Sequence, residues 1–399
     1  MPISPITTPK EEPVRPPGRR LQWPLDPGLT LAVIGLGICS VLTLEQATRN
    51  LVKGNPHYYV DRQIIYLAVG VVLMVALSRL DYVLLKRMKN GIYGVMMLGI
   101  LAVLAVGHTN TTRGGQRSIE FPLFSFQASE LGKVLLIAAL AAFVVERSRR
   151  LSERDTTARI VIAALVPAMF VIAQPDLGSG LVYMVIACMM LFIAGTSWRH
   201  LASLFALVLV SGAFVLAVAP AAGVHVVKQY QVERLTAFLH PSSNPEKRGY
   251  QQEESKIAIG SGQKTGRGLN SDQTSNGFVP ESHTDFIFAA VGERWGFVGA
   301  GIVLLLYALL MSRALRILVM AKDLYGSLIA AGVTAMLMFQ VFVNVGMTIG
   351  IMPITGVTLP LMSYGGSSVI TTLLGVGLLQ SIYVQSRASA ALKSRVLRF

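Results

Sequence analysis

Charge is the scarcest property of this 399-residue chain: Asp, Glu, Lys and Arg make up 14% of it, whereas 53% is hydrophobic. A soluble domain carries roughly 25% charged residues. Two stretches, residues 201–227 and 324–386, contain no charged residue at all, and a water-soluble fold would have to bury both completely. The composition excludes a soluble globular protein and a disordered one. It predicts an all-α polytopic integral membrane protein.

Cysteine is nearly absent as well. Cys39 and Cys188 are the only two. Both fall in apolar stretches, and neither has a partner at a metal-ligand or redox spacing. They are best interpreted as small packing residues, because the sequence contains no cysteine framework for disulfides or zinc.

Ten apolar stretches are long enough to cross a bilayer core, which takes ~20 residues of helix. They cover residues 27–45, 62–80, 91–106, 129–146, 159–174, 178–195, 201–220, 285–312, 325–350 and 367–385. Only Pro175 and Asp176 mark the reversal between the fifth and the sixth. We expect a single membrane domain over residues 27–386, with a disordered Pro-rich basic tail (1–26) before it and a basic tail (387–399) after it.

Basic residues predict the orientation of these spans. The net charge of +14 would suit a nucleic-acid partner, but Lys and Arg also collect in the cytoplasmic loops of membrane proteins, so we expect no nucleic acid. Placing both termini in the cytoplasm puts most basic clusters there too. The exported face then holds residues 107–128, the turn at Asp176, a long loop at 221–284, and residues 351–366. A loop of that length is usually functional.

Ionisable residues at membrane depth are costly and mark functional sites by default. Glu130 and Lys133 begin the fourth span on one helix face, where they can pair. Arg117 precedes them in a glycine-loosened basic loop that could meet an anion. The alternative is a purely structural Glu130–Lys133 ion pair, with the nearby arginines at the lipid headgroups.

Two further exported features carry polar side chains. Asp176 lies in a Pro-broken turn, where it could serve a site or simply cap the next helix. The long loop contains Arg234 and Lys256, the latter in a glycine- and lysine-rich turn (255–262) that suits phosphate contact. A partner-docking or solvated loop explains that turn equally well.

The strongest constellation is Glu281, His283 and Asp285, three ionisable side chains within five residues where the chain re-enters the bilayer. A carboxylate at such a boundary is partly desolvated, which suits it to act as a general base. The alternative is a helix N-cap at Thr284 or Asp285. Glu293 lies about two turns deeper as a further intramembrane carboxylate.

Residues 352–368 carry no charge but contain two prolines and paired glycines, which predicts broken helix and exposed backbone amides. Such backbone survives at membrane depth only where it lines a cavity or is buried by protein. This segment could therefore line a cavity. A structural re-entrant turn is the alternative.

At these positions the sequence resembles the SEDS family of cell-wall proteins (shape, elongation, division and sporulation). The matching motifs lie at residues 62–63, 81–82, 129–133, 174–178, 283–288 and 344–368. Within the family the chain looks more like the elongation branch, RodA, than the division branch, FtsW, on residues 255–262 and 347–356. It departs from the pattern at Ser118, where the family usually has Trp, and after Gly262, where Gln263 and Lys264 replace Gly and Leu.

The resemblance implies a peptidoglycan glycosyltransferase that polymerises lipid II at the outer face of the bacterial cytoplasmic membrane, for cell elongation and shape. It implies a class B penicillin-binding protein and other elongation-complex membrane proteins as partners. We expect Asp285 to be the catalytic base, Glu130 to orient Lys133, and Asp176 to shape the cavity, with His283 and Ser363 beside the substrate. The pyrophosphate would be held by Arg117, Lys133, Arg234, Lys256 and the backbone of Gly365 and Gly366, and a divalent cation (magnesium or manganese) could share that task.

Two alternatives use the same spans. A lipid II flippase would use Glu293 and the Glu130–Lys133 pair along its pathway. A non-catalytic scaffold would only recruit a cell-wall synthase.

Overall fold

Helices make up nearly all of the regular structure. The computed structural model describes residues 25–52, 55–106, 108–110, 115–120, 125–151, 153–174, 176–200, 202–203, 206, 249–268, 271–279 and 281–396. Eight of the described helices are long and apolar enough to cross a membrane: α1 (Pro27–Ala47), α2 (Tyr58–Arg79), α4 (Lys89–Val106), α5 (Ala128–Glu146), α6 (Arg154–Ala173), α13 (Ile287–Met320), α14 (Leu324–Ile349) and α15 (Gly366–Val396). A ninth apolar helix, α7 (Leu177–Ile193), is shorter.

These helices confirm the predicted polytopic all-helical membrane fold. Each predicted span coincides with one of them except the seventh, residues 201–220, which lies largely outside the described residues. The predicted break between the fifth and sixth spans is also present, because α6 ends at Ala173 and Asp176 is the N-cap of α7. Short helices α3 (Val83–Arg87), α11 (Gly249–Ser261), α12 (Asp272–Ser275) and the 3-10 turn η1 (Ser148–Arg150) lie in the connections.

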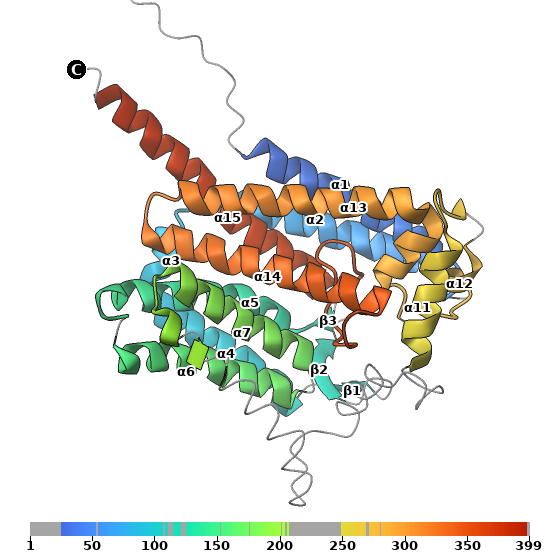
Figure 1. Cartoon of the computed structure of the whole chain (residues 1–399), viewed down its shortest axis with the longest axis horizontal. Coiled ribbons are helices and arrows are strands. Elements are labelled where there is room, and N and C mark those ends of the chain that lie inside the picture. The colour runs from blue at the N-terminus through green and yellow to red at the C-terminus, as the bar shows by residue number, and fades with distance from the viewer. Residues whose placement is uncertain are drawn as a thin grey trace, which may run out of the picture.

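The long helices lie side by side, and the two ends of the bundle differ (Figure 1). The strands, α11 and α12 gather at one end, which we call the sheet end; α1 begins and α15 leaves at the other, the terminal end. Helices α5, α14 and α15 form the centre, with 78% of each spanning window buried, against 17% for α4. A polar side chain on the central helices is therefore surrounded by protein.

Close helix contacts depend on glycine at two positions where α2 packs along α15. A Cβ on Gly70 would collide with the Leu373 side chain, and one on Gly377 would lie 3.0 Å from the Met74 carbonyl oxygen. In a membrane, burial of apolar surface contributes little to helix association, so small residues that let helices approach closely are important for packing. The α2–α15 contact brings Tyr58 and Tyr59, at the start of α2, to the sheet end.

The segment expected as a loosened loop before α5 is instead a small antiparallel sheet. It consists of β1 (His108–Asn110), β2 (Gly115–Glu120) and β3 (Ser125–Phe126), in that order. Ile119 pairs with Phe126 across β2 and β3, and both pack against the main core. A β-branched residue facing an aromatic one is a stabilising cross-strand pair, so the prediction missed strands too short to give an alternating pattern.

The turn predicted at residues 255–262 is wrong for most of its length, because helix α11 runs from Gly249 to Ser261. Helix α11 packs against α13 and α14. Ser255 is fully buried and donates to the Thr348 carbonyl (2.9 Å). Burial of one face against the bundle overrides the weak helix propensity of glycine and serine in this stretch.

Helix α13 is broken at Gly296, which has φ 64° and ψ −161°. The turn after α11 supplies hydrogen-bond acceptors for the N–H groups that the break leaves unpaired within α13. The Phe297 and Val298 N–H groups donate to the carbonyls of Gln263 (2.8 Å) and Lys264 (3.1 Å). Neighbouring backbone often re-satisfies groups freed in a broken membrane helix. The eighth span, predicted to end at residue 312, continues to Met320 beyond this kink.

Between α14 and α15 the chain is irregular and largely buried, as the prolines and glycines predicted. Gly350 ends α14 with φ 88°, a left-handed conformation that favours glycine. Leu359, Leu361 and Met362 are fully buried. This segment, residues 351–365, is therefore held by the bundle and supports the sheet end.

Candidate active site

A cavity of about 410 Å³ opens at the sheet end. Its walls come from segments far apart in the sequence: the start of α2, strands β2 and β3, the starts of α5, α7 and α15, residues 283–285, and the segment before α15. The lining side chains are mostly polar: Tyr58, Tyr59, Ser118, Glu120, Ser125, Gln127, Glu130, Asp176, Ser179, His283, Thr284, Asp285, Gly356, Thr358, Tyr364, Gly365, Ser367 and Ser368.

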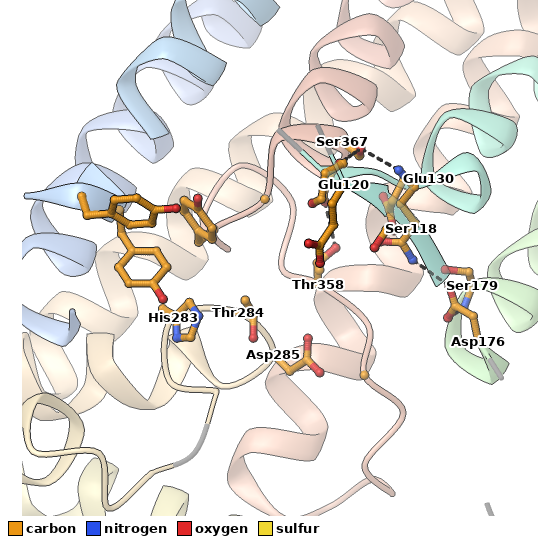
Figure 2. Close-up of a pocket in the computed structure, with 18 residues that line it drawn as sticks. Ser118, Glu120, Glu130, Asp176, Ser179, His283, Thr284, Asp285, Thr358 and Ser367 are labelled. Atoms are coloured by element: carbon orange, nitrogen blue, oxygen red, sulfur yellow. Dashed lines mark hydrogen bonds between the residues drawn. The ribbon is translucent and has the colours of Figure 1, made fainter. Parts of the chain in front are cut away.

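Asp285 and the polar cluster around Asp176 lie on different sides of this cavity. Figure 2 shows His283, Thr284 and Asp285 along one side, with Glu130, Asp176 and Ser179 across from them. The sequence predicted both groups at one membrane face, and the structure brings them to one cavity.

The chain around Asp285 is held by hydrogen bonds to its backbone. The Tyr364 N–H donates to the His283 carbonyl (2.8 Å), and the Ser363 hydroxyl donates to the Thr284 carbonyl (2.6 Å). The N-cap of α13 is Phe286, and no side chain caps that end. The capping alternative for Thr284 and Asp285 is therefore wrong, because Thr284 donates instead to the Glu281 carboxylate (2.6 Å).

Asp176 combines the two roles that the sequence left open. Its Oδ1 accepts from the Ser179 N–H (3.1 Å), which caps α7. Its Oδ2 accepts from Ser129 (2.9 Å) and from Gln127 (3.0 Å). The carboxylate thereby ties the start of α5 to the start of α7 while it lines the cavity.

Glu130 and Lys133 form the predicted ion pair, with 2.6 Å between Oε1 and Nζ. Both are buried, at 5% and 1% exposure. Glu130 lines the cavity, whereas Lys133 lies behind it. A buried, paired charge of this kind holds its geometry well, since both ions lose their partner if either moves.

Five helices begin around the cavity: α2, α5, α7, α13 and α15. The first turn of a helix carries unpaired N–H groups and about half a positive charge, which attracts anions such as phosphate. At the start of α15, Gly365, Ser367 and Ser368 line the cavity. The Ser367 hydroxyl donates to the Ser125 carbonyl (2.7 Å) and the Ser368 hydroxyl is hydrogen-bonded to Thr358 (2.8 Å), so the helix start itself is what the site offers to an anionic group.

An aromatic wall closes one side of the cavity. The rings of Tyr59 and His283 lie 4.9 Å apart, and those of Tyr59 and Tyr364 also 4.9 Å. Burial, reinforced by the nearby Tyr66, raises the pKa of Tyr364 above its usual value. Tyr364 therefore stays a neutral hydroxyl at physiological pH.

Some predicted site residues lie elsewhere or are not described. Lys256 is on α11, where its Nζ pairs with Glu253 (3.0 Å), and it does not line the cavity. Gly366 packs against the Tyr66 ring. Arg234 and the side chain of Arg117, whose backbone belongs to β2, lie outside the described residues.

Several cavity residues escaped the sequence analysis. Tyr58 and Tyr59 lie a few residues before the motif at residues 62–63, and Gln127 lies two residues before Ser129, the start of the next motif, so proximity to a motif was their only signal. Glu120 and Thr358 carry no signal of their own. These side chains reach the cavity only through helix packing and the β2–β3 pairing.

A metal site does not assemble from the residues that the structure describes. Among them, no group of three His, Cys, Asp or Glu side chains could hold a metal ion. Glu130 is already paired with Lys133, and Asp176 already accepts three hydrogen bonds.

Comparison with known proteins identifies the family of this chain. The sequence profile of the FtsW, RodA and SpoVE proteins, described as "Cell cycle protein", matches residues 25–388. The chain belongs to this family, the SEDS family of membrane-embedded peptidoglycan glycosyltransferases.

Its relatives carry several different names within this family. The chain is 34% identical over 375 residues to peptidoglycan glycosyltransferase MrdB of Escherichia coli K12, covering 93% of this chain and 97% of MrdB. It is 33% identical over 361 residues to stage V sporulation protein E of Bacillus subtilis, covering 90% and 96%. The probable peptidoglycan glycosyltransferase FtsW of Thioalkalivibrio sulfidiphilus is 34% identical over 383 residues, covering 94% and 93%.

Solved structures agree with the fold. A chain of a peptidoglycan synthase complex that coordinates polymerization and crosslinking matches with a TM-score of 0.73 and 32% identity, covering 91% of this chain and 98% of that one. The rod-shape-determining protein RodA of Thermus thermophilus matches with a TM-score of 0.65 and 30% identity, covering 92% and 98%.

Proposed function

We propose that this chain polymerises lipid II into glycan strands at the outer face of the cytoplasmic membrane, with Asp285 as the catalytic base. The observation that carries the proposal is the placement of Asp285 in a polar cavity at one end of the membrane helices, opposite Asp176 and among five helix N-termini. The reactive sugar of an undecaprenyl pyrophosphate substrate lies at that depth, just outside the bilayer.

In the reaction, Asp285 removes the proton from the 4-hydroxyl of the acceptor N-acetylglucosamine. The oxygen attacks C1 of the donor N-acetylmuramic acid and forms the new glycosidic bond with inversion. The bond from C1 to the pyrophosphate oxygen breaks, and the lipid pyrophosphate leaves with the electron pair. A positioned base contributes on the order of 10²–10⁴-fold to such a step.

The leaving pyrophosphate needs positive potential or oriented donors. The start of α15, with Gly365, Ser367 and Ser368 at the cavity wall, supplies the positive potential of a helix N-terminus. Glu130 faces the cavity with Lys133 behind it, so Lys133 offsets the negative charge that Glu130 would otherwise present to the phosphates. Asp176 keeps the two helix starts at a fixed separation.

The cellular role follows from the same assignment. We place the sheet end at the exported face and both termini in the cytoplasm, as the basic loops predict. The relatives named MrdB and RodA favour a role in elongation and cell shape, and the sequence features at residues 255–262 and 347–356 agree. The match to a synthase-complex chain supports a class B penicillin-binding protein as partner, beside other elongation-complex membrane proteins.

The feature that favoured a flippase has a structural explanation. The Glu293 carboxylate is fully buried and accepts three hydrogen bonds: from the Gln273 N–H (2.9 Å), the Thr274 N–H (2.9 Å) and the Thr274 hydroxyl (2.7 Å). It fixes α12 against α13. No transport role is needed to explain this carboxylate.

The test uses the purified complex with its penicillin-binding partner, in detergent, with lipid II and a transpeptidase inhibitor. Detergent removes the membrane that a flippase would need to cross. We expect glycan strands that a muramidase degrades. A complex that binds lipid II but forms no polymer, while a reference glycosyltransferase polymerises the same lipid II, would contradict the proposal and favour a scaffold or flippase.

A further inference from the structure

Asn344 lies on α14 directly behind Asp285 and is fully buried. One amide hydrogen is donated to the Asp285 carbonyl (2.8 Å) and the other to the Val357 carbonyl (2.7 Å). An asparagine amide has two donor hydrogens, so both are used on backbone carbonyls. The Asn344 Oδ1 is buried and accepts no hydrogen bond from the described residues.

The bond to Asp285 completes a set of three. Three consecutive carbonyls, of His283, Thr284 and Asp285, each accept one hydrogen bond from the α14–α15 region: from the Tyr364 N–H, the Ser363 hydroxyl and the Asn344 amide. Because peptide units are planar, a hydrogen bond to a carbonyl fixes the orientation of its whole peptide plane.

The two planes that flank the Asp285 Cα are therefore both held. Ser363 fixes the plane before it, which sets the φ of Asp285, and Asn344 fixes the plane after it, which sets the ψ. Together the two planes determine the direction of the Cα–Cβ bond, from which the Asp285 carboxylate extends. The second bond of Asn344 holds Val357, which lies between the cavity-lining Gly356 and Thr358.

We infer that Asn344 is a positioning residue for the glycosyl transfer: it fixes the backbone from which the Asp285 carboxylate extends and couples it to the facing wall at residues 356–358. This inference rests on the proposed role of Asp285 as the base. It assigns no contact with substrate to Asn344, which is buried behind the cavity. Misplacement of a reacting group by about 1 Å can cost on the order of 100-fold in rate.

The test replaces Asn344 by leucine, which has a similar shape, removes both donors and leaves no unpaired side-chain oxygen. We expect kcat for lipid II polymerisation by the purified complex to fall on the order of 100-fold, with KM changed by less than about twofold. The matched control is Gln340→Leu, one turn earlier on α14. Gln340 is also a buried amide (1% exposed), and its side-chain oxygen has no hydrogen-bond partner among the described residues. Its replacement is expected to leave kcat within about twofold.

An unchanged kcat in N344L, whether or not KM rises, would overturn the inference. An equal loss of kcat in Q340L would also overturn it, because any buried amide on α14 would then matter alike. If N344L does not fold, the same kinetic measurement is made on Asn344→Ser. Its smaller side chain leaves room for a water molecule that can donate hydrogen bonds to the Asp285 and Val357 carbonyls. A fall of about tenfold in kcat at constant KM supports positioning, and wild-type kcat contradicts it.

Asp285→Asn, measured in parallel, separates this inference from the proposed function. If D285N polymerises lipid II normally, the assignment of the base fails, and the inference fails with it. If D285N is inactive while N344L is fully active, only the inference about Asn344 fails.

Discussion

Lys133 and Glu130 form an ion pair sealed within the bundle: the Nζ and Oε1 atoms are 2.6 Å apart, and the Lys133 side chain is 1% exposed. Removing one partner leaves an uncompensated buried charge, which costs about 3–5 kcal/mol. We therefore expect Glu130→Gln and Lys133→Met each to lower the free energy of unfolding by that order, as measured by unfolding of the purified protein in detergent.

The double variant Glu130→Leu/Lys133→Met separates stability from function. Replacing a whole buried pair by apolar residues is often neutral, so stability should largely return. Polymerisation should stay low, since Glu130 lines the cavity and the double variant replaces its polar carboxylate there by an apolar side chain. Wild-type activity in the double variant would show that the ion pair stabilises the fold and has no role in polymerisation.

Glycine is required where the turn after α11 meets the kink of α13. A Cβ on Gly266 would collide with the Arg294 carbonyl, and Gly266 has φ 87°. We expect Gly266→Ala to destabilise the protein by more than about 2 kcal/mol, because backbone cannot move aside as a side chain can. Gly260→Ala is the matched control, since a Cβ there meets nothing within 4 Å and alanine favours the helix. Equal losses of melting temperature in the two variants would contradict this account.

Gln263 occupies a strained backbone conformation, with φ 48°. A non-glycine residue there costs about 1 kcal/mol relative to glycine. We expect Gln263→Gly to raise the melting temperature, because it relieves this strain. The hydrogen bond from the Phe297 N–H is retained, since its acceptor is the backbone carbonyl of residue 263. Gln263→Ala, which keeps a Cβ, should give no such gain; a gain equal to that of glycine would rule out backbone strain as the cause.

Asp26 joins α1 to α13 and α15 at the terminal end. Its carboxylate caps α1 through the Leu29 N–H (2.8 Å) and pairs with Arg313, and its backbone N–H donates to Gln380 (2.7 Å). Burial alone would raise the pKa of Asp26, but the hydrogen bond and charge of Arg313 and the Leu29 N–H together lower it below 3.8. The ion pair therefore contributes stability above the ordinary aspartate pKa, and this contribution is lost as pH falls through the folded-state value.

The corresponding measurement compares Asp26→Asn with the wild type across pH. Near pH 7 the variant should be less stable by about 2–4 kcal/mol. The difference should shrink as pH falls below about 4. A difference that stays constant down to the lowest pH at which the protein folds would show that the charge of Asp26 is not what matters.

The sequence predicted the spans well because uninterrupted apolar runs determine membrane helices almost alone. It also placed Asp285, Glu130 and Asp176 at one membrane face, since the loops between spans fix the face on which a residue lies. It could not predict which of these side chains share a cavity, because that depends on helix neighbours. Tyr59 and Thr358 reach the wall only through such packing.

The errors have the same origin. Helix α11 owes its conformation to burial against α13 and α14, which local glycine and lysine content does not reveal. The capping interpretation of Asp285 used local sequence alone. In the structure, hydrogen bonds from Asn344 and Ser363, 59 residues and more away, hold that segment instead.

The most direct test of the account is the rate of lipid II polymerisation by the purified complex carrying Asp285→Asn, compared with Glu281→Gln. Both variants neutralise a carboxylate in the same short segment, but the Glu281 carboxylate accepts from Thr284 and does not line the cavity. We predict that D285N lowers the rate by about 10²–10⁴-fold with unchanged melting temperature, the range expected for loss of a positioned base. E281Q should lose less than about tenfold. Polymerisation by D285N at the wild-type rate would contradict the account.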